Sequence, residues 1–208
     1  MMKRTMVLGG SLALAGLVIL AGHSVVRAGP DSRLDDNELQ EALQKYNNAS
    51  KAHRVLKKFR GKYEQVAMWY NAPGKKPKED KWTSATGWLL NGLFMTQTVD
   101  GKWLGRDYDG LLTIGYDYGA EEYVMTWIDS YHTRLVEGRG TFEEDTETFT
   151  FECSFFDAIA DKDRTVKAVM KLVDRKGGCH IELTDITDPK KPFKFYEIDS
   201  KRRLRRGA

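Results

Sequence analysis

A short segment holds the three residue types of a nucleophilic catalytic triad. It runs from Thr126 to Thr133 and contains Asp129, Ser130 and His132. A triad needs hydrogen bonds of about 2.6–3.2 Å between its members. On one continuous strand, Asp129 points away from Ser130 and His132, and residues two apart have Cα atoms roughly 7 Å apart. This geometry disfavours a hydrolase centre.

The same segment favours a ligand contact instead. Trp127 and Asp129 lie two residues apart and therefore share one face of a strand. If that face is the interior of the protein, Asp129 is a buried polar group that needs a partner, such as Arg134, Tyr116 or a ligand. We expect tryptophan side chains to form the walls of the site and Asp129 to orient the ligand. The candidate ligand-binding residues are Trp69, Tyr116, Trp127 and Asp129.

Signals for metals and cofactors are weak. His53, His132 and His180 are scattered, and no two of them have the spacing of metal ligands. A single histidine could ligate haem, but a lone histidine is more often a surface or hydrogen-bonded residue. The acidic loop 157–163 lacks the glycine and terminal glutamate of an EF-hand. We therefore expect no metal, no cofactor and no catalytic residue.

Residues 1–28 have the pattern of a cleavable signal peptide. Two basic residues precede an apolar run at 6–22, and Val26 and Ala28 stand at positions −3 and −1 of a cleavage site. We expect cleavage after Ala28 and export to the periplasm or the exterior. An uncleaved membrane anchor is the alternative, because the 17-residue run approaches the lower limit for spanning a bilayer.

Beyond the signal segment the chain is close to neutral. Without Lys3, Arg4 and Arg27, the 33 basic residues fall to 30, which equals the number of acidic residues. Proteins that bind nucleic acid normally carry a strong basic excess, so the balance argues against that class. The basic tail at 201–206 is a local exception that could make a weak contact with an anionic envelope surface. A solvated chain end is the simpler interpretation.

The two cysteines predict buried thiols. Cys153 and Cys179 are the only cysteines, and they do not form a C-x-x-C motif. Export permits a disulfide. The strands predicted below, however, place one strand between the two residues, which separates their Cα atoms by roughly 10 Å and puts them beyond disulfide reach.

Two helical segments precede a long β region. Apolar residues have helical spacing at 37–48 and 50–59, with Ser50 as the N-cap of the second segment. From residue 62 the period falls to about two. Asn91-Gly92 and Asp100-Gly101 predict turns. Strands are predicted at 63–70, 82–90, 93–99, 108–116, 122–130, 133–142, 146–155, 165–173, 179–187 and 192–200, with a short one at 102–105.

This pattern predicts an all-β antiparallel fold. Tight turns join the strands and no long helix lies between them, so parallel βαβ units are disfavoured. A barrel of about eight to ten strands removes the exposed edges of such a sheet, and a sandwich is the alternative. The predicted organisation is a signal peptide at 1–28, a linker with a short helix at 29–49, the barrel at 50–203 and the end of the basic tail at 204–208.

A series of residues also keeps the order of a known family between residues 50 and 203. The series comprises His53, Leu56, Phe59, Gly61, Tyr63, Glu64, Gly92-Leu93-Phe94, Gly110, Gly115-Tyr116-Asp117, Tyr123, Thr126-Trp127-Ile128-Asp129-Ser130, Glu137-Gly138, Glu197-Ile198 and Arg202. It resembles the bacterial family called domain of unknown function 1579, in which tryptophan usually stands where this chain has Tyr63. The resemblance implies a barrel similar to the lipocalin, or calycin, and fatty-acid-binding class, and no established activity.

The sequence is therefore compatible with two functions. The first is a binding module that holds a small apolar or amphipathic molecule inside the barrel. The second is a structural or interaction protein of the cell envelope whose barrel core is filled by its own side chains. An interior cavity would favour the first function and a filled core the second. An enzyme lacks any supporting motif in this sequence.

We predict that Trp127 is shielded from iodide in the folded protein. The measurement uses a variant in which the other four tryptophans are replaced, so that Trp127 alone fluoresces. An indole that faces the interior is out of reach of an aqueous anion, so iodide quenches it much less in the folded protein than after unfolding in urea. Free quenching of the folded protein would place Trp127 on the outer face and contradict the prediction.

Overall fold

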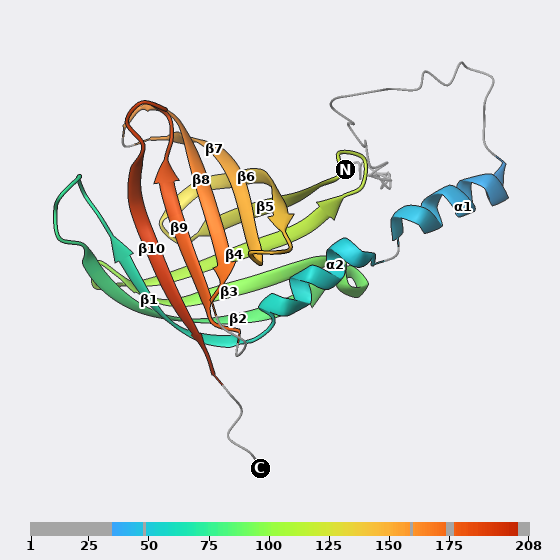
Figure 1. The fold of residues 1–208 in the computed structure, drawn as a ribbon, viewed down its shortest axis with the longest axis horizontal. Helices are drawn as coiled ribbons and strands as arrows, with labels where there is room; N and C mark the ends of the chain where they lie inside the picture. The colour runs from blue at the N-terminus through green and yellow to red at the C-terminus, as the bar shows by residue number, and fades with distance from the viewer. Residues whose placement is uncertain (1–34, 48, 159, 174–176, 204–208) are drawn as a thin grey trace, which may run out of the picture. The chain divides into compact units, whose positions relative to one another are not determined.

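The computed structural model describes residues 35–47, 49–158, 160–173 and 177–203 (Figure 1). The chain divides into two compact units, 1–40 and 41–208, and the second unit contains the barrel. The helices of the described residues are α1 (Asp36–Asn47), α2 (Lys51–Leu56) and the 3-10 helices η1 (Lys57–Phe59) and η2 (Leu90–Gly92). In the described part of the chain, no helix is long and apolar enough to cross a membrane. The predicted signal segment lies outside the described residues.

Ten antiparallel strands close into a barrel, as the sequence pattern predicted (Figure 1). Each strand pairs with its neighbours in sequence, and β1 pairs with β10 to complete the ring. The sandwich alternative is therefore wrong. The more specific likeness to lipocalins stays a prediction. The strands are β1 (Lys62–Trp69), β2 (Lys78–Leu89), β3 (Phe94–Trp103), β4 (Arg106–Asp117), β5 (Glu122–Asp129), β6 (His132–Glu143), β7 (Thr148–Asp157), β8 (Lys162–Leu172), β9 (Cys179–Asp185) and β10 (Phe193–Arg202).

Alternating residues give each strand one interior and one exterior face. On β8, Val166, Ala168, Met170 and Leu172 are buried, whereas Lys167 and Lys171 between them are exposed. The inner face of β7 contributes aromatic rings to the same core. These faces agree with the sequence pattern, because successive side chains of a strand point to opposite sides of the sheet.

Two strand boundaries differ most from the prediction. Strand β3 continues through Asp100-Gly101, and the turn falls at Leu104-Gly105, where both residues have positive φ (54° and 80°). Gly101 serves packing instead, because a Cβ there would lie 2.4 Å from Cδ1 of Trp82. Strand β2 begins at Lys78, before its predicted start at residue 82, because its polar residues pair with the end of β1.

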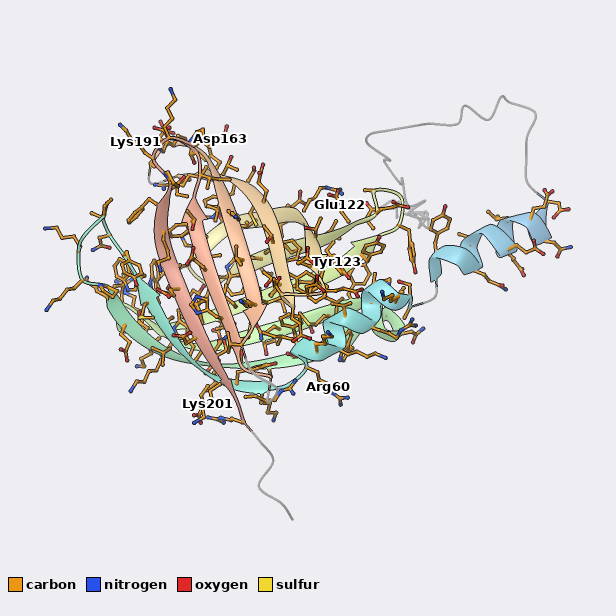
Figure 2. All side chains as sticks on the ribbon, in the orientation of Figure 1. Arg60, Glu122, Tyr123, Asp163, Lys191 and Lys201 are labelled. Carbon is orange, nitrogen blue, oxygen red and sulfur yellow. The ribbon has the colours of Figure 1, made fainter. Side chains whose placement is uncertain are left out.

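Helix α2 and η1 close one end of the barrel. Ser50 caps α2: its hydroxyl accepts from the Ala52 N–H, while the imidazole of His53 accepts from the Ser50 N–H. Leu56 and Phe59 are buried in the core that the strands enclose. The Tyr123 hydroxyl, which comes from β5, donates to the backbone oxygen of Ala52 at 3.0 Å (Figure 2). These contacts hold the helix across the strand ends, and we call this the closed end.

The opposite end carries the β1–β2, β3–β4, β5–β6, β7–β8 and β9–β10 connections, and we call it the mouth. Figure 2 shows Asp163 and Lys191 at the mouth, and Arg60 and Lys201 near the closed end. The predicted basic tail begins within β10, which ends at Arg202. The Arg202 guanidinium donates to the Lys58 backbone oxygen at 3.2 Å. Residues 204–208 lie outside the described residues.

Both cysteines are free and buried, as predicted. Cys153 lies on β7 and pairs with Val166 of β8, whereas Cys179 on β9 pairs with Leu172 at the other end of β8. Burial raises the pKa of the Cys153 thiol to about 11 and that of Cys179 to about 12. Both groups are therefore neutral thiols at physiological pH.

We predict that protonation of His53 destabilises the fold. Burial lowers the pKa of His53 below its ordinary value of about 6.5. As the pH falls below that value, the unfolded chain takes up a proton that the folded protein does not, so the free energy of unfolding declines until the lowered pKa is reached. Above about pH 6.5 this contribution is constant.

Urea unfolding of the wild type and of His53→Gln at about pH 7.5 and pH 5 measures the effect. Since the carboxylates contribute equally to both proteins, the loss on acidification should be smaller in the variant. An equal loss in the two proteins would contradict the assignment of this effect to His53.

Candidate functional site

A cavity of about 580 Å³ lies inside the barrel and opens at the mouth. Its deeper wall is apolar, and it becomes more polar toward the strand ends. The barrel core is therefore not filled by its own side chains. The deeper wall includes Leu112, Ile114, Val136, Phe151, Met170 and Leu183.

A network of aromatic rings lines the cavity near the mouth. Trp103 contacts Tyr131 and Trp69, with ring centroids 4.9 Å and 6.1 Å apart. Trp82 stacks on Tyr108 at 5.0 Å. Burial, and then the nearby Asp129 carboxylate, raise the pKa of Tyr108, so this phenol is neutral at physiological pH. Trp69, predicted as a site residue, thus lines the cavity as part of an aromatic wall.

Asp129 lines the cavity, but the protein itself engages both of its oxygens. Oδ1 accepts from the backbone N–H groups of Tyr131 and His132 and lies 2.8 Å from His132 Nδ1. Oδ2 accepts from the Trp127 indole at 3.1 Å. Its buried carboxylate therefore caps the β5–β6 turn and positions Trp127. The predicted pairing with Tyr116 or Arg134 is wrong.

The β5–β6 turn explains where the strand-alternation argument was wrong. Asp129 and His132 were expected to point apart, yet they form a cross-strand pair. The turn at Ser130 and Tyr131 reverses the chain between them and brings both side chains inside. The Ser130 hydroxyl accepts from the Asp109 N–H at 3.0 Å instead. The geometry joins Asp129 to His132 and directs Ser130 to the neighbouring strand.

Trp127 lies against a glycine that the sequence pattern did not identify as part of the site. A Cβ at Gly110 of β4 would lie 2.3 Å from Cη2 of Trp127. No real Cβ approaches another heavy atom that closely. Gly110 therefore lets the indole lie flat on the barrel wall, where Asp129 holds its N–H. The two-residue spacing of Trp127 and Asp129 did predict that they share this interior face.

Arg164 ties two aspartates together at the mouth. Its guanidinium pairs with Asp157 at 2.6 Å and with Asp185 at 2.5 Å. Burial raises the pKa of Asp185, but hydrogen bonds from Thr187 and the charge and hydrogen bond of Arg164 outweigh it, so that pKa lies below its ordinary value. This cluster links β7, β8 and β9 at the rim of the cavity, and both aspartates are committed to it.

Arg134 of β6 is the other guanidinium that lines the cavity. It lies over the ring of Phe155, 4.2 Å from the centroid. Within the described residues, Arg134 makes no ion pair with a carboxylate, and its Nε is buried without an acceptor. Arg134 is thus a guanidinium of the cavity wall with a buried donor that the protein leaves without an acceptor.

Tyr116 lies away from this cavity. It packs at the closed end against His53, Tyr118 and Tyr123, with ring centroids 5.1–6.2 Å apart. There it lines a second hollow beside α2. The structure thus brings together Trp69, Trp127 and Asp129 and separates Tyr116 from them, because Tyr116 lies at the far end of its strand.

The histidines that were weighed as ligands have protein partners. His132 contacts Asp129, and His180 lies 2.8 Å from Asp199 and 3.6 Å from Glu197. Across the described ranges, no three histidine, cysteine, aspartate or glutamate side chains gather in a way that could hold a metal ion.

We predict that Gly110→Ala displaces Trp127 and destabilises the protein by about 1–3 kcal/mol, the usual cost of overpacking. The new methyl group competes with the indole for the same space. Urea unfolding measures the stability, and near-ultraviolet circular dichroism reports the change in tryptophan packing.

Gly119→Ala is the matched control, since a Cβ there meets only Asp117 Oδ1 at 3.3 Å. This variant should unfold close to the wild type. If Gly110→Ala did so too, the proposed contact with Trp127 would be refuted.

Comparison with protein families gives a match that covers every strand of the barrel. The matched family is described as protein of unknown function (DUF1579), and the match spans residues 48–202. A search of curated proteins gave no match. The matched region contains α2, η1 and all ten strands, together with the cavity described above. This chain belongs to the family of proteins of unknown function DUF1579.

Proposed function

We propose that this protein binds a small apolar or amphipathic molecule inside its barrel. The observation that carries the proposal is the cavity of about 580 Å³. Ligand pockets typically enclose about 300–1,000 Å³, with apolar and aromatic walls and a few placed polar groups. The interior has this composition, with aliphatic and aromatic residues toward the closed end and Arg134, Asp129 and Arg164 toward the mouth.

The predicted site residues take different parts in this proposal. Trp69 and Trp127 form walls that a ligand would contact. Asp129 holds Trp127 in place and thereby shapes the cavity, since its oxygens already accept from the protein. Tyr116 supports the closed end. Polar contact with the ligand then falls to other groups.

We further propose that binding takes place outside the cytoplasm. The support is the signal-peptide pattern of residues 1–28. The alternative of an envelope interaction protein would be better supported by a core without free volume. A weak envelope contact through the basic tail would compete at Arg202 and Arg203 with the contacts that they make to Lys58 and Glu64.

Native mass spectrometry of the protein purified from its exporting host tests the proposal. We expect a reproducible extra mass that is lost on denaturation, because a ligand held in the cavity survives gentle ionisation. A bare protein mass, combined with no uptake of the neutral apolar dye Nile red, would count against a binding function.

A cavity-filling variant locates the bound molecule. Ala168 is buried on the inner face of β8, and Lys167 next to it is exposed. Ala168→Phe places a ring in the cavity and should weaken Nile red binding severalfold or more. Lys167→Phe adds the same ring outside the barrel and should leave the affinity unchanged. Equal affinities in the two variants would exclude the cavity as the binding site.

A further inference from the structure

Among the described residues around the cavity, the three carboxylates have direct partners within the protein. Asp129 is engaged by Trp127, Tyr131 and His132. Asp157 and Asp185 share Arg164. Among the described residues, this leaves Arg134 as the cation of the cavity wall without a carboxylate partner.

Burial makes that missing partner significant. The Nε atom of Arg134 is shielded from solvent and has no acceptor. Phe155 supports the guanidinium plane from one side, which fixes its direction without satisfying its N–H groups. A buried donor without an acceptor costs free energy. A ligand that supplies an anionic acceptor removes this cost and forms a charge-assisted hydrogen bond.

Other orphaned groups on the cavity wall point the same way. The indole N–H groups of Trp69 and Trp103 are buried without acceptors. Indole can only donate, so these groups also favour a ligand that brings acceptor atoms. Gln65 Oε1 on the same wall is an acceptor without a donor. Gln65 lies opposite Trp82 in the β1–β2 register, several residues inward from the mouth, so it is separate from the groups at the mouth.

We propose that the ligand carries an anionic head group that Arg134 binds, attached to an apolar chain that extends toward the closed end. This inference rests on the proposed binding function and narrows it to a class of molecule. Arg134 lies near the mouth, whereas Ile114 and Met170 line the deeper wall. The polarity of the cavity along the barrel axis therefore matches that of an amphiphile with its charge outermost.

Three probes that share one chain test this inference: decanoate, decyl phosphate and decan-1-ol, titrated calorimetrically into the ligand-free protein. We expect both anions to bind about tenfold or more tightly than the alcohol, because a hydrogen-bonded charge contact adds that much affinity. The anion with the higher affinity indicates whether the natural head group is a carboxylate or a phosphate ester.

Variants locate the effect on Arg134. Arg134→Met keeps the length and apolar stem of the side chain, so it should retain decan-1-ol binding and lose the preference for the anions. Arg139→Met is the matched control, because Arg139 lies on the same strand but is exposed and pairs with Glu122 at 2.6 Å. This control should keep the preference.

The outcomes separate the inference from the function on which it rests. Equal affinity of the wild type for all three probes would overturn the anionic head group and leave a binding function in place. A preference that survives in Arg134→Met would overturn the role of Arg134. If none of the three probes binds, the proposed binding function itself fails. Should Arg134→Met not fold, the wild-type comparison alone decides whether the head group is anionic.

Discussion

The pairing of β1 with β10 is the constraint on which the rest of the structure depends. It joins Tyr63 to Arg202 and Trp69 to Tyr196, across nearly the whole length of the barrel sequence. Without this ladder both strands would present unpaired edges, and the inner faces of ten strands would not enclose a common space. Closure of the ring makes the apolar faces of the strands enclose one interior. The charged groups at the mouth are shielded from water only because this interior exists, and therefore they need partners.

Large aromatic rings and glycines share the inner surface in a complementary way. Trp82 lies against Gly101, and Trp127 lies against Gly110. Each indole lies along the wall instead of projecting across the barrel, because its neighbour has no side chain. Volume therefore stays open beside β6, β7 and β8, whose side chains line the cavity. Side chains of ordinary size at these glycines would push the rings into that space.

Much of the fold could be predicted from local patterns, and most of the site could not. Period-two alternation gave the faces of β7 and β8, and the spacing of Trp127 and Asp129 placed both inside, because these features depend only on backbone geometry. The same reasoning was wrong at Asp100-Gly101, where a glycine serves packing, and for Asp129 and His132, where a turn intervenes. The isolation of Arg134 depends on which carboxylates Arg164 and His132 engage, and strand spacing carries no information about such distant pairings.

The path of the chain also determines how the barrel can be attached to a surface. Because the number of strands is even and each reverses the last, β1 begins and β10 ends at the closed end. The polypeptide thus enters and leaves the barrel on the side away from the mouth. A tether that extends from the C-terminal end of β10 would leave the mouth unobstructed. An immobilised form of the protein would therefore keep the mouth of the barrel, and the cavity behind it, facing the surrounding solution.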